Sequence, residues 1–215
     1  MGIRARAFAV ACSLILALPL GAAAQSSYDV ILKAAAEGNA PVVGDLLARG
    51  LDPNTADAEG YTLLMLAARS GHAELAKLLL ERKAGVSRRS PHGDTALLLA
   101  SLKGHLAVVK VLVEHGAPVN GPGWAPVHYA AFEGRAEILN YLIEKGADKN
   151  ALGPNGYTAL MLACRGGHID AAKALLGWDV DFHIKGPKGE TALAIAQSRK
   201  DLALEQLLRR AGAVD

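Results

Sequence analysis

The chain has 215 residues, with 23 lysines and arginines against 21 aspartates and glutamates, and a formal net charge of +2 at pH 7. Electrostatic binding of nucleic acid needs a concentrated excess of Lys and Arg that displaces counterions, so the nearly balanced charge excludes a nucleic-acid partner. Aromatic residues make up only 5% of the sequence, so a local cluster of aromatic side chains stands out against the rest.

The first 24 residues have the pattern of a secretory signal peptide. Arg4 and Arg6 precede the apolar run FAVACSLILALPLG, and small residues at 22–24 favour cleavage before Gln25. The apolar run is short for a membrane span, which leaves a retained N-terminal anchor as the alternative. Cleavage removes two arginines and no acid, so the mature chain is formally neutral. We therefore expect residues 25–215 to be exported to the periplasm or, as the alternative, secreted, without membrane attachment.

A phrase of the sequence recurs with a period close to 33 residues. GYTLLMLAARSGH begins at Gly60 and returns as GYTALMLACRGGH at Gly156. The corresponding glycines at 93, 123 and 189 show that one step, from 93 to 123, is three residues short. Such a period is typical of stacked units, because none of them can bury its apolar face alone. The units are expected at residues 28–56, 57–89, 90–119, 120–152, 153–185 and 186–215.

Each unit is predicted to contain two short antiparallel helices. A threonine at its start can cap the first helix through the hydroxyl oxygen. A glycine such as Gly71 then ends this helix in a tight turn, and a second helix with a bulkier apolar face follows, as at Leu75, Leu78 and Leu79. The capping threonines are Thr62, Thr95, Thr158 and Thr191.

These phrases resemble those of the ankyrin repeat family over Tyr28 to Asp215, because GxTxLxxA, GH and LLxxGAxxN recur in step. The resemblance implies an all-α ankyrin-repeat solenoid of about six helix-turn-helix units with β-hairpin or loop fingers. The family's Thr-Pro-Leu-His phrase keeps Pro and His only at Pro126 and His128, where Ala125 replaces Thr. No unit keeps both Thr and His, so we expect apolar stacking to replace this polar link.

The histidines and the one cysteine of the mature chain form no recognisable catalytic or metal-binding motif. His72, His105 and His168 occupy the same slot in three units, which predicts a role in stabilising turns. Cys164 lies four residues before His168, a spacing that a metal site could use, but two glycines between them should end the helix. The sequence also lacks GxSxG, HExxH and a phosphate-binding glycine loop. We predict no enzyme activity, no metal and no cofactor.

The fingertips and the exposed side of the first helices are predicted to form a long concave face that binds another protein. The residue after the repeat glycine is aromatic in three of five units, and aromatic and arginine side chains dominate interface energies. In a second interpretation, the tyrosines among them only cover the finger backbone. The predicted partner-binding residues are Trp124, Phe132, Tyr61, Tyr157, Arg69, Asp94, Lys103, Glu133, Arg165 and Glu190.

Trp124 and Phe132 are predicted to be the main anchors of this face. Trp124 follows the shortened connection NGPG, where a lowered fingertip should open a notch, and Tyr129 belongs to the same unit. Trp178 interrupts the pattern of its own unit and is interpreted as local packing. The sequence therefore predicts one principal binding position near the middle of the stack.

The leading functional interpretation is a non-enzymatic, monomeric scaffold that binds another protein in the bacterial periplasm. Resemblance to exported bacterial ankyrin proteins implies one specific role, the support of an oxidative-stress enzyme of the catalase type. One alternative is an immunity protein that neutralises a toxin by covering its active site. Another is a metal-dependent enzyme whose ionisable side chains converge in the concave face.

Overall fold

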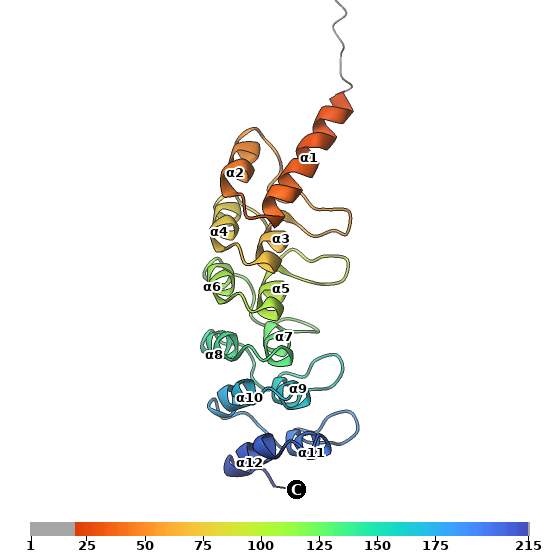
Figure 1. Cartoon of the computed structure of the whole chain (residues 1–215), viewed down its shortest axis with the longest axis vertical. Helices are drawn as coiled ribbons and strands as arrows, with labels where there is room; N and C mark the ends of the chain where they lie inside the picture. Colours follow the sequence, from red (N-terminus) through yellow and green to blue (C-terminus); the bar gives the residue numbers. More distant parts are fainter. Residues whose placement is uncertain (1–19, 215) are drawn as a thin grey trace, which may run out of the picture.

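The structure, a computed structural model, describes residues 20–214, so most of the predicted signal peptide lies outside the described residues. Helices in this part of the chain form two layers, and consecutive helices alternate between them (Figure 1). The first layer contains α1 (Leu20–Ala36), α3 (Leu63–Ser70), α5 (Ala96–Lys103), α7 (Pro126–Phe132), α9 (Ala159–Gly166) and α11 (Ala192–Ser198). The second layer contains α2 (Ala40–Ala48), α4 (Ala73–Glu81), α6 (Leu106–Glu114), α8 (Ala136–Glu144), α10 (Ile169–Leu176) and α12 (Leu202–Arg210).

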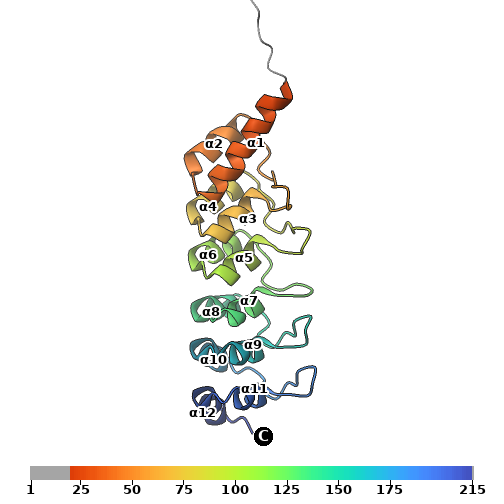
Figure 2. The ribbon, with the colours of Figure 1, turned by 45° about the vertical axis from the view of Figure 1, so that its right-hand side comes forward.

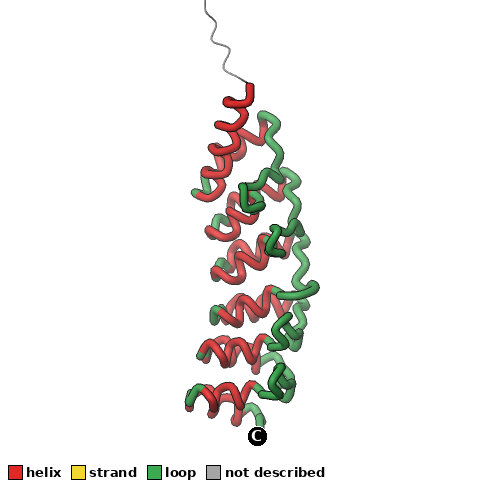
Figure 3. The backbone as a smooth tube through the Cα atoms, turned by 90° about the vertical axis from the view of Figure 1, so that its right-hand side faces the viewer, coloured by secondary structure: helices red, strands yellow, loops and turns green. Residues whose placement is uncertain are grey.

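The helix pairs stack in chain order into an all-helical solenoid. Each first-layer helix packs on the next, α3 on α5, α5 on α7 and α7 on α9, and the two layers run side by side along the long axis (Figure 2). The long loops gather along one edge, where they form the fingers (Figure 3). Among the described residues no strand is present, and a single isolated bridge joins Ala56 and Thr62 in one finger. The predicted solenoid is therefore confirmed.

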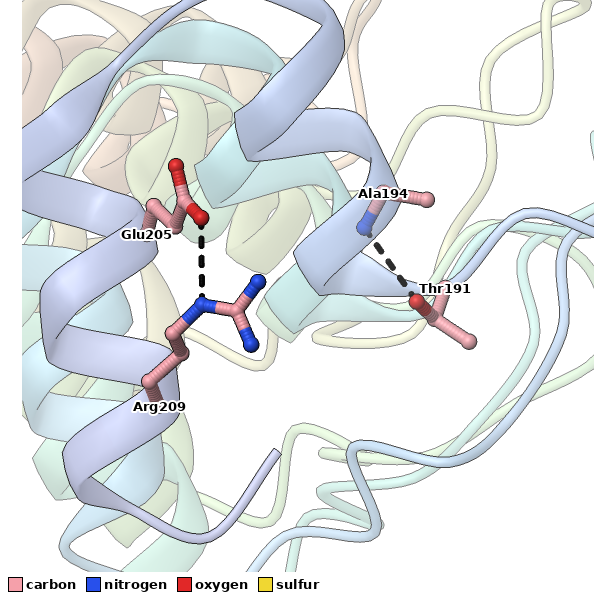
Figure 4. A network of polar contacts seen from close by, with 4 residues as sticks. All are labelled: Thr191, Ala194, Glu205 and Arg209. Atoms are coloured by element: carbon pink, nitrogen blue, oxygen red, sulfur yellow. Dashed lines mark hydrogen bonds and ion pairs between the residues drawn. The ribbon is translucent and has the colours of Figure 1, made fainter. Parts of the chain in front are cut away.

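Local sequence signals explain where the first-layer helices begin and end. The four predicted threonines cap α3, α5, α9 and α11, and each hydroxyl oxygen accepts the backbone N–H three residues later. Figure 4 shows one cap, in which Thr191 Oγ1 accepts from the N–H of Ala194 at 3.2 Å. At the other end of α3, Gly71 adopts a left-handed conformation with φ 85°, which suits a residue without a Cβ.

Two columns of identical residues run through the core at the repeat period. The first layer contributes small side chains and the second layer contributes leucines, and the side chains of both columns have no exposed surface. The small residues let successive first-layer helices approach closely, while the leucines fill the space between the layers. The columns are Ala67, Ala100, Ala130, Ala163 and Ala196, and Leu79, Leu112, Leu142, Leu175 and Leu208.

The repeated histidines link each unit to the one before it. The Nε2 atoms of His72, His105 and His168 lie 3.0, 3.2 and 2.9 Å from the carbonyl oxygens of Ala36, Arg69 and Phe132, respectively. Each acceptor lies at the C-terminal end of a first-layer helix, where carbonyl groups lack a partner within the helix. The predicted structural role of these histidines is therefore confirmed. Their bonds also connect each turn to the preceding unit.

His128 makes the polar link that we expected apolar stacking to replace, so that expectation was wrong for this unit. Its Nδ1 accepts the N–H of Ala125 at 3.0 Å, and its Nε2 lies 2.9 Å from the carbonyl oxygen of Ala151 in the next finger. Both partners are backbone groups, and the one at position 125 is an N–H that every residue except proline provides. The loss of threonine there consequently does not remove the link.

The last helix has the polar outer face expected of a terminal unit. Arg209 Nε donates to Glu205 Oε1 at 3.0 Å across one turn of α12 (Figure 4), and Gln206, Arg209 and Arg210 are exposed. A terminal unit lacks a neighbour on one side, which accounts for the charged surface. Within residues 20–214 no helix is both long enough and apolar enough to span a bilayer.

Candidate protein-binding face

An apolar pocket of about 300 Å³ opens between α5 and α7. Trp124, at the base of the preceding finger, forms one wall, and Phe132, at the end of α7, forms another with 53% of its surface exposed. Apolar side chains around a concave surface are typical of sites that bind a ligand or an anchoring side chain. The remaining lining residues are Leu102, His128 and Tyr129.

The position of Trp124 follows from the shortened connection. The loop between α6 and α7 covers residues 115–125, three fewer than the equivalent loop at 82–95. The indole ring packs edge-on against His128, with 5.7 Å between centroids, and at a tilt against Tyr129 at 5.8 Å. A Cβ at Gly153 would lie 3.0 Å from its Cζ3 atom, so the ring also lies against the next finger. Trp124 is therefore half-buried and held on two sides.

Phe132 belongs to a column of equivalent residues at the C-terminal ends of first-layer helices. Arg69, Leu102 and Arg165 occupy the same position in α3, α5 and α9. The backbone carbonyl groups of Arg69 and Phe132 accept bonds from the histidines of the next unit, and that of Arg165 accepts from Arg199 Nη1 at 2.7 Å. Contacts between units thus hold the backbone at Arg69, Phe132 and Arg165, whose side chains are exposed, whereas Leu102 is half-buried. Together with the finger bases, this column forms what we call the candidate face.

The tyrosines of the candidate face are bound to the acidic residues predicted beside them. Tyr61 donates its hydroxyl to Asp94 Oδ2 at 3.2 Å, and Tyr157 donates to Glu190 Oε1 at 2.6 Å. Burial and the nearby Asp94 charge raise the pKa of Tyr61, whereas the hydrogen bond to Glu190 is the main cause that raises the pKa of Tyr157. The same bond lowers the pKa of Glu190. The hydroxyl group of each tyrosine therefore pairs with the carboxylate of the acidic residue on the adjacent finger.

Two arginines lie over the rings of these tyrosines. The Arg69 Cζ atom is 5.2 Å from the centroid of Tyr61, and the Arg165 Cζ atom is 5.5 Å from that of Tyr157. Both arginines are exposed. Stacking on an aromatic face restrains a guanidinium group but leaves its N–H edge available to a partner.

The ten predicted residues thus divide into three groups. Trp124 and Phe132 meet at the pocket, and Tyr61, Tyr157, Asp94 and Glu190 pair with one another. Of the other four, Arg69 and Arg165 lie over the tyrosine rings. Lys103 and Glu133 follow the pocket residues Leu102 and Phe132; Lys103 is exposed, and the Glu133 carboxylate is 3.7 Å from the Arg135 guanidinium. His128 was interpreted only as structural, and its place in the pocket wall was missed, although its position one turn after Trp124 was a usable signal.

The three residues considered for a metal site have separate structural roles. His128 and His168 bond backbone carbonyl groups, and Cys164 is fully buried. Burial raises the pKa of the Cys164 thiol to about 12, so the group stays protonated near neutral pH and is a poor metal ligand. Among residues 20–214 no three His, Cys, Asp or Glu side chains gather around a common point.

Comparison with protein families gives a match along almost the whole stack. The model described as ankyrin repeats (3 copies) matches residues 31–122, 83–153 and 127–214. The chain belongs to the ankyrin repeat family. Ankyrin repeats are protein-interaction modules, and repeat stacks of this kind present extended surfaces to their partners.

One solved structure and one curated relative described as ankyrin repeat proteins agree with this assignment. The crystal structure of the human ASB11 ankyrin repeat domain superposes with a TM-score of 0.81 at 30% identity, covering 86% of this chain and 84% of that one. A putative ankyrin repeat-containing protein of Treponema pallidum is 39% identical over 85 residues, 39% of this chain and 28% of the relative. An L-asparaginase of Dirofilaria immitis is 41% identical over 86 residues, 40% of this chain and 15% of the relative. The chain thus spans less than a third of these two curated relatives.

Proposed function

We propose that this ankyrin repeat protein is a non-enzymatic module that binds another protein at the pocket between α5 and α7. The observation that supports this is the exposed Phe132 beside a half-buried Trp124 in the wall of one apolar pocket. An aromatic residue in an apolar depression is the type of feature that dominates binding energy at protein interfaces. Because the His168 bond to the Phe132 carbonyl group holds the C-terminal end of α7, little ordering of that backbone should be needed on binding.

The proposed location is the bacterial periplasm, with residues 25–215 as the mature, monomeric chain. This part of the proposal is supported by the charged start, short apolar run and small residues of the N-terminal 24 residues. In this proposed location, the partner is an enzyme of the cell envelope, and a catalase-type oxidative-stress enzyme is the specific candidate.

Affinity capture from an envelope extract tests the proposal. The bait is the exported chain, whose intact mass should show a start at Gln25. Replacing Trp124 and Phe132 with alanine should weaken capture by about 2–4 kcal/mol because both apolar anchors are lost. Phe132→Ala alone should reduce capture without disturbing the core, since this side chain is largely exposed. Trp178→Ala is the matched control, because Trp178 bonds Asn140 through its Nε1 and lies outside the candidate face.

The activity of the captured partner also shows whether this protein acts as a scaffold or as an inhibitor. A scaffold should leave the activity of its partner intact or protect it, whereas an immunity protein should abolish the activity of a toxin. Capture that is unchanged in the double variant, with helical content retained, would disprove the proposed binding position.

A further inference from the structure

The charged residues at the C-terminal ends of the first-layer helices from α3 to α11 are mostly cations, whereas residues 25–215 as a whole are formally neutral. At the ends of α3, α5, α7, α9 and α11 the charged side chains are four cations and one carboxylate, that of Glu133. Glu133 has the Arg135 guanidinium 3.7 Å away, which offsets its charge. The four cations are Arg69, Lys103, Arg165 and Arg199.

The two carboxylates of the candidate face at the finger bases, Asp94 and Glu190, are already engaged inside the protein. Asp94 accepts from Tyr61 at 3.2 Å, and Glu190 accepts from both Tyr157 and the N–H of Lys188, at 2.6 and 2.8 Å. Both acids are half-buried at the finger bases, whereas Arg69 and Arg165 are exposed. A partner that approaches the candidate face therefore meets guanidinium groups before it meets carboxylates.

The order of side chains along the column is cation, apolar, apolar, cation. Arg69 and Arg165 lie on α3 and α9, and Leu102 and Phe132, both in the pocket wall, lie on α5 and α7 between them. Successive packed helices are about 8–10 Å apart, so the two arginines are separated by about 25–30 Å. An extended segment in the polyproline II conformation rises about 3.1 Å per residue with about three residues per turn, so about nine residues span this distance and positions about three residues apart face the same side.

From this order we propose that the candidate face binds an extended segment of a partner protein with two apolar side chains at its centre and an acidic residue near each end. This inference rests on the proposed function and specifies the partner's chemistry. The central apolar side chains enter the pocket beside Trp124 and Phe132. The terminal carboxylates meet Arg69 and Arg165, whose stacking on Tyr61 and Tyr157 orients the planar guanidinium groups for paired hydrogen bonds.

The test uses three fluorescent synthetic peptides of about ten residues, matching the estimated span. All three share the same two central leucines about three residues apart, and they differ only in whether both ends carry Glu, Gln or Lys. Fluorescence anisotropy with the mature chain should show the Glu peptide binding about 3- to 10-fold more tightly than the Gln peptide, the scale of two exposed charge pairs. The Lys peptide should bind most weakly.

Protein variants then assign this preference to the two arginines. Arg69→Gln and Arg165→Gln should each weaken binding of the Glu peptide and leave binding of the Gln peptide unchanged. Arg210→Gln is the matched control, because it removes the same charge from α12, in the other layer. Phe132→Ala should weaken binding of all three peptides.

Equal binding of the Glu and Gln peptides, a preference for Lys, or no detectable binding of the Glu peptide at about 1 mM would overturn the inference. A loss in Arg210→Gln as large as in Arg69→Gln would also overturn it. If capture of an envelope protein depends on Trp124 and Phe132 while the peptides show no acidic preference, the proposed function stands and only this inference fails.

Discussion

At the scale of single residues, His128 links the stability of the stack to the binding pocket. Its side chain is fully buried, lines the pocket, and bonds backbone groups through both ring nitrogens. Since Nδ1 accepts from the N–H of Ala125, the proton must be on Nε2, which donates to the carbonyl group of Ala151. A second proton on Nδ1 would face an N–H donor, so only the neutral ring fits this site.

We therefore predict that His128 makes the protein less stable in mild acid. Burial lowers the pKa of His128 below its ordinary value of 6.5, so the unfolded chain takes up the proton first as the pH falls. The free energy of unfolding should then decrease below about pH 6.5, by at most about 1.4 kcal/mol per pH unit from this residue. Urea unfolding at about pH 7.5 and 5.5 measures the loss, which should be smaller in His128→Gln. An equal loss in both proteins would contradict the prediction.

At the scale of helices, the bonds between units weaken at the unit that contains the pocket. Histidine or arginine from the next unit reaches the carbonyl groups of Ala36, Arg69, Phe132 and Arg165. At the end of α5, the residue in the slot of these histidines is Arg135, which pairs with Glu133 instead. The Arg135 Nε atom is buried without a hydrogen-bond partner among the described residues. The junction between α5 and α7 therefore combines the apolar pocket with a less satisfied polar contact.

Arg135→His is predicted to stabilise the protein by restoring the repeated bond. The arginine side chain now lies against Gly104, 2.8 Å from where a Cβ would be, much as His105 lies against Gly71 at 2.7 Å. A ring in this place can bond the Leu102 carbonyl group, for about 0.5–1.5 kcal/mol. The exposed pair with Glu133 that is lost contributes at most about 1 kcal/mol. Thermal unfolding should show a higher Tm in the variant.

The reciprocal change provides the control for this prediction. His105→Ala removes the bond to Arg69 and should lower Tm by a comparable amount. A Tm of Arg135→His equal to or below that of the wild type would show that the bond does not form or does not matter.

At the scale of the whole molecule, every unit is stabilised mainly by its two neighbours. The buried alanine and leucine columns are continuous through the stack, while α12 presents charged residues on its outer side. In such a one-dimensional array the terminal units have one interface instead of two. Local opening should therefore be easiest at the ends.

Amide hydrogen exchange is predicted to be faster in the terminal units than in the middle of the stack. Amide groups of the interior helices α4, α6, α8 and α10 should exchange more slowly than those of α2 and α12, because the interior helices have neighbours on both sides. Exchange monitored by mass spectrometry or NMR gives the order directly. Slowest exchange in α2 or α12 would contradict a stack stabilised by nearest neighbours.

The sequence by itself determined the period, the helix pairs and their ends, because these depend on contacts within a few residues. A threonine hydroxyl reaches an N–H three residues away, and a left-handed glycine ends the same helix, so both signals can be read locally. The aromatic residues at 124 and 132 also stood out against a chain with few aromatics, which was sufficient to predict the centre of the candidate face.

Only the tertiary structure decided which of those residues remain available to a partner. Tyr61 with Asp94 and Tyr157 with Glu190 are each 33 residues apart, and whether their side chains point outward or toward each other depends on how neighbouring units are rotated. The pocket likewise needs Leu102 from one unit and Trp124 from the next. Such contacts arise between repeats, and the pattern within a single repeat does not specify them.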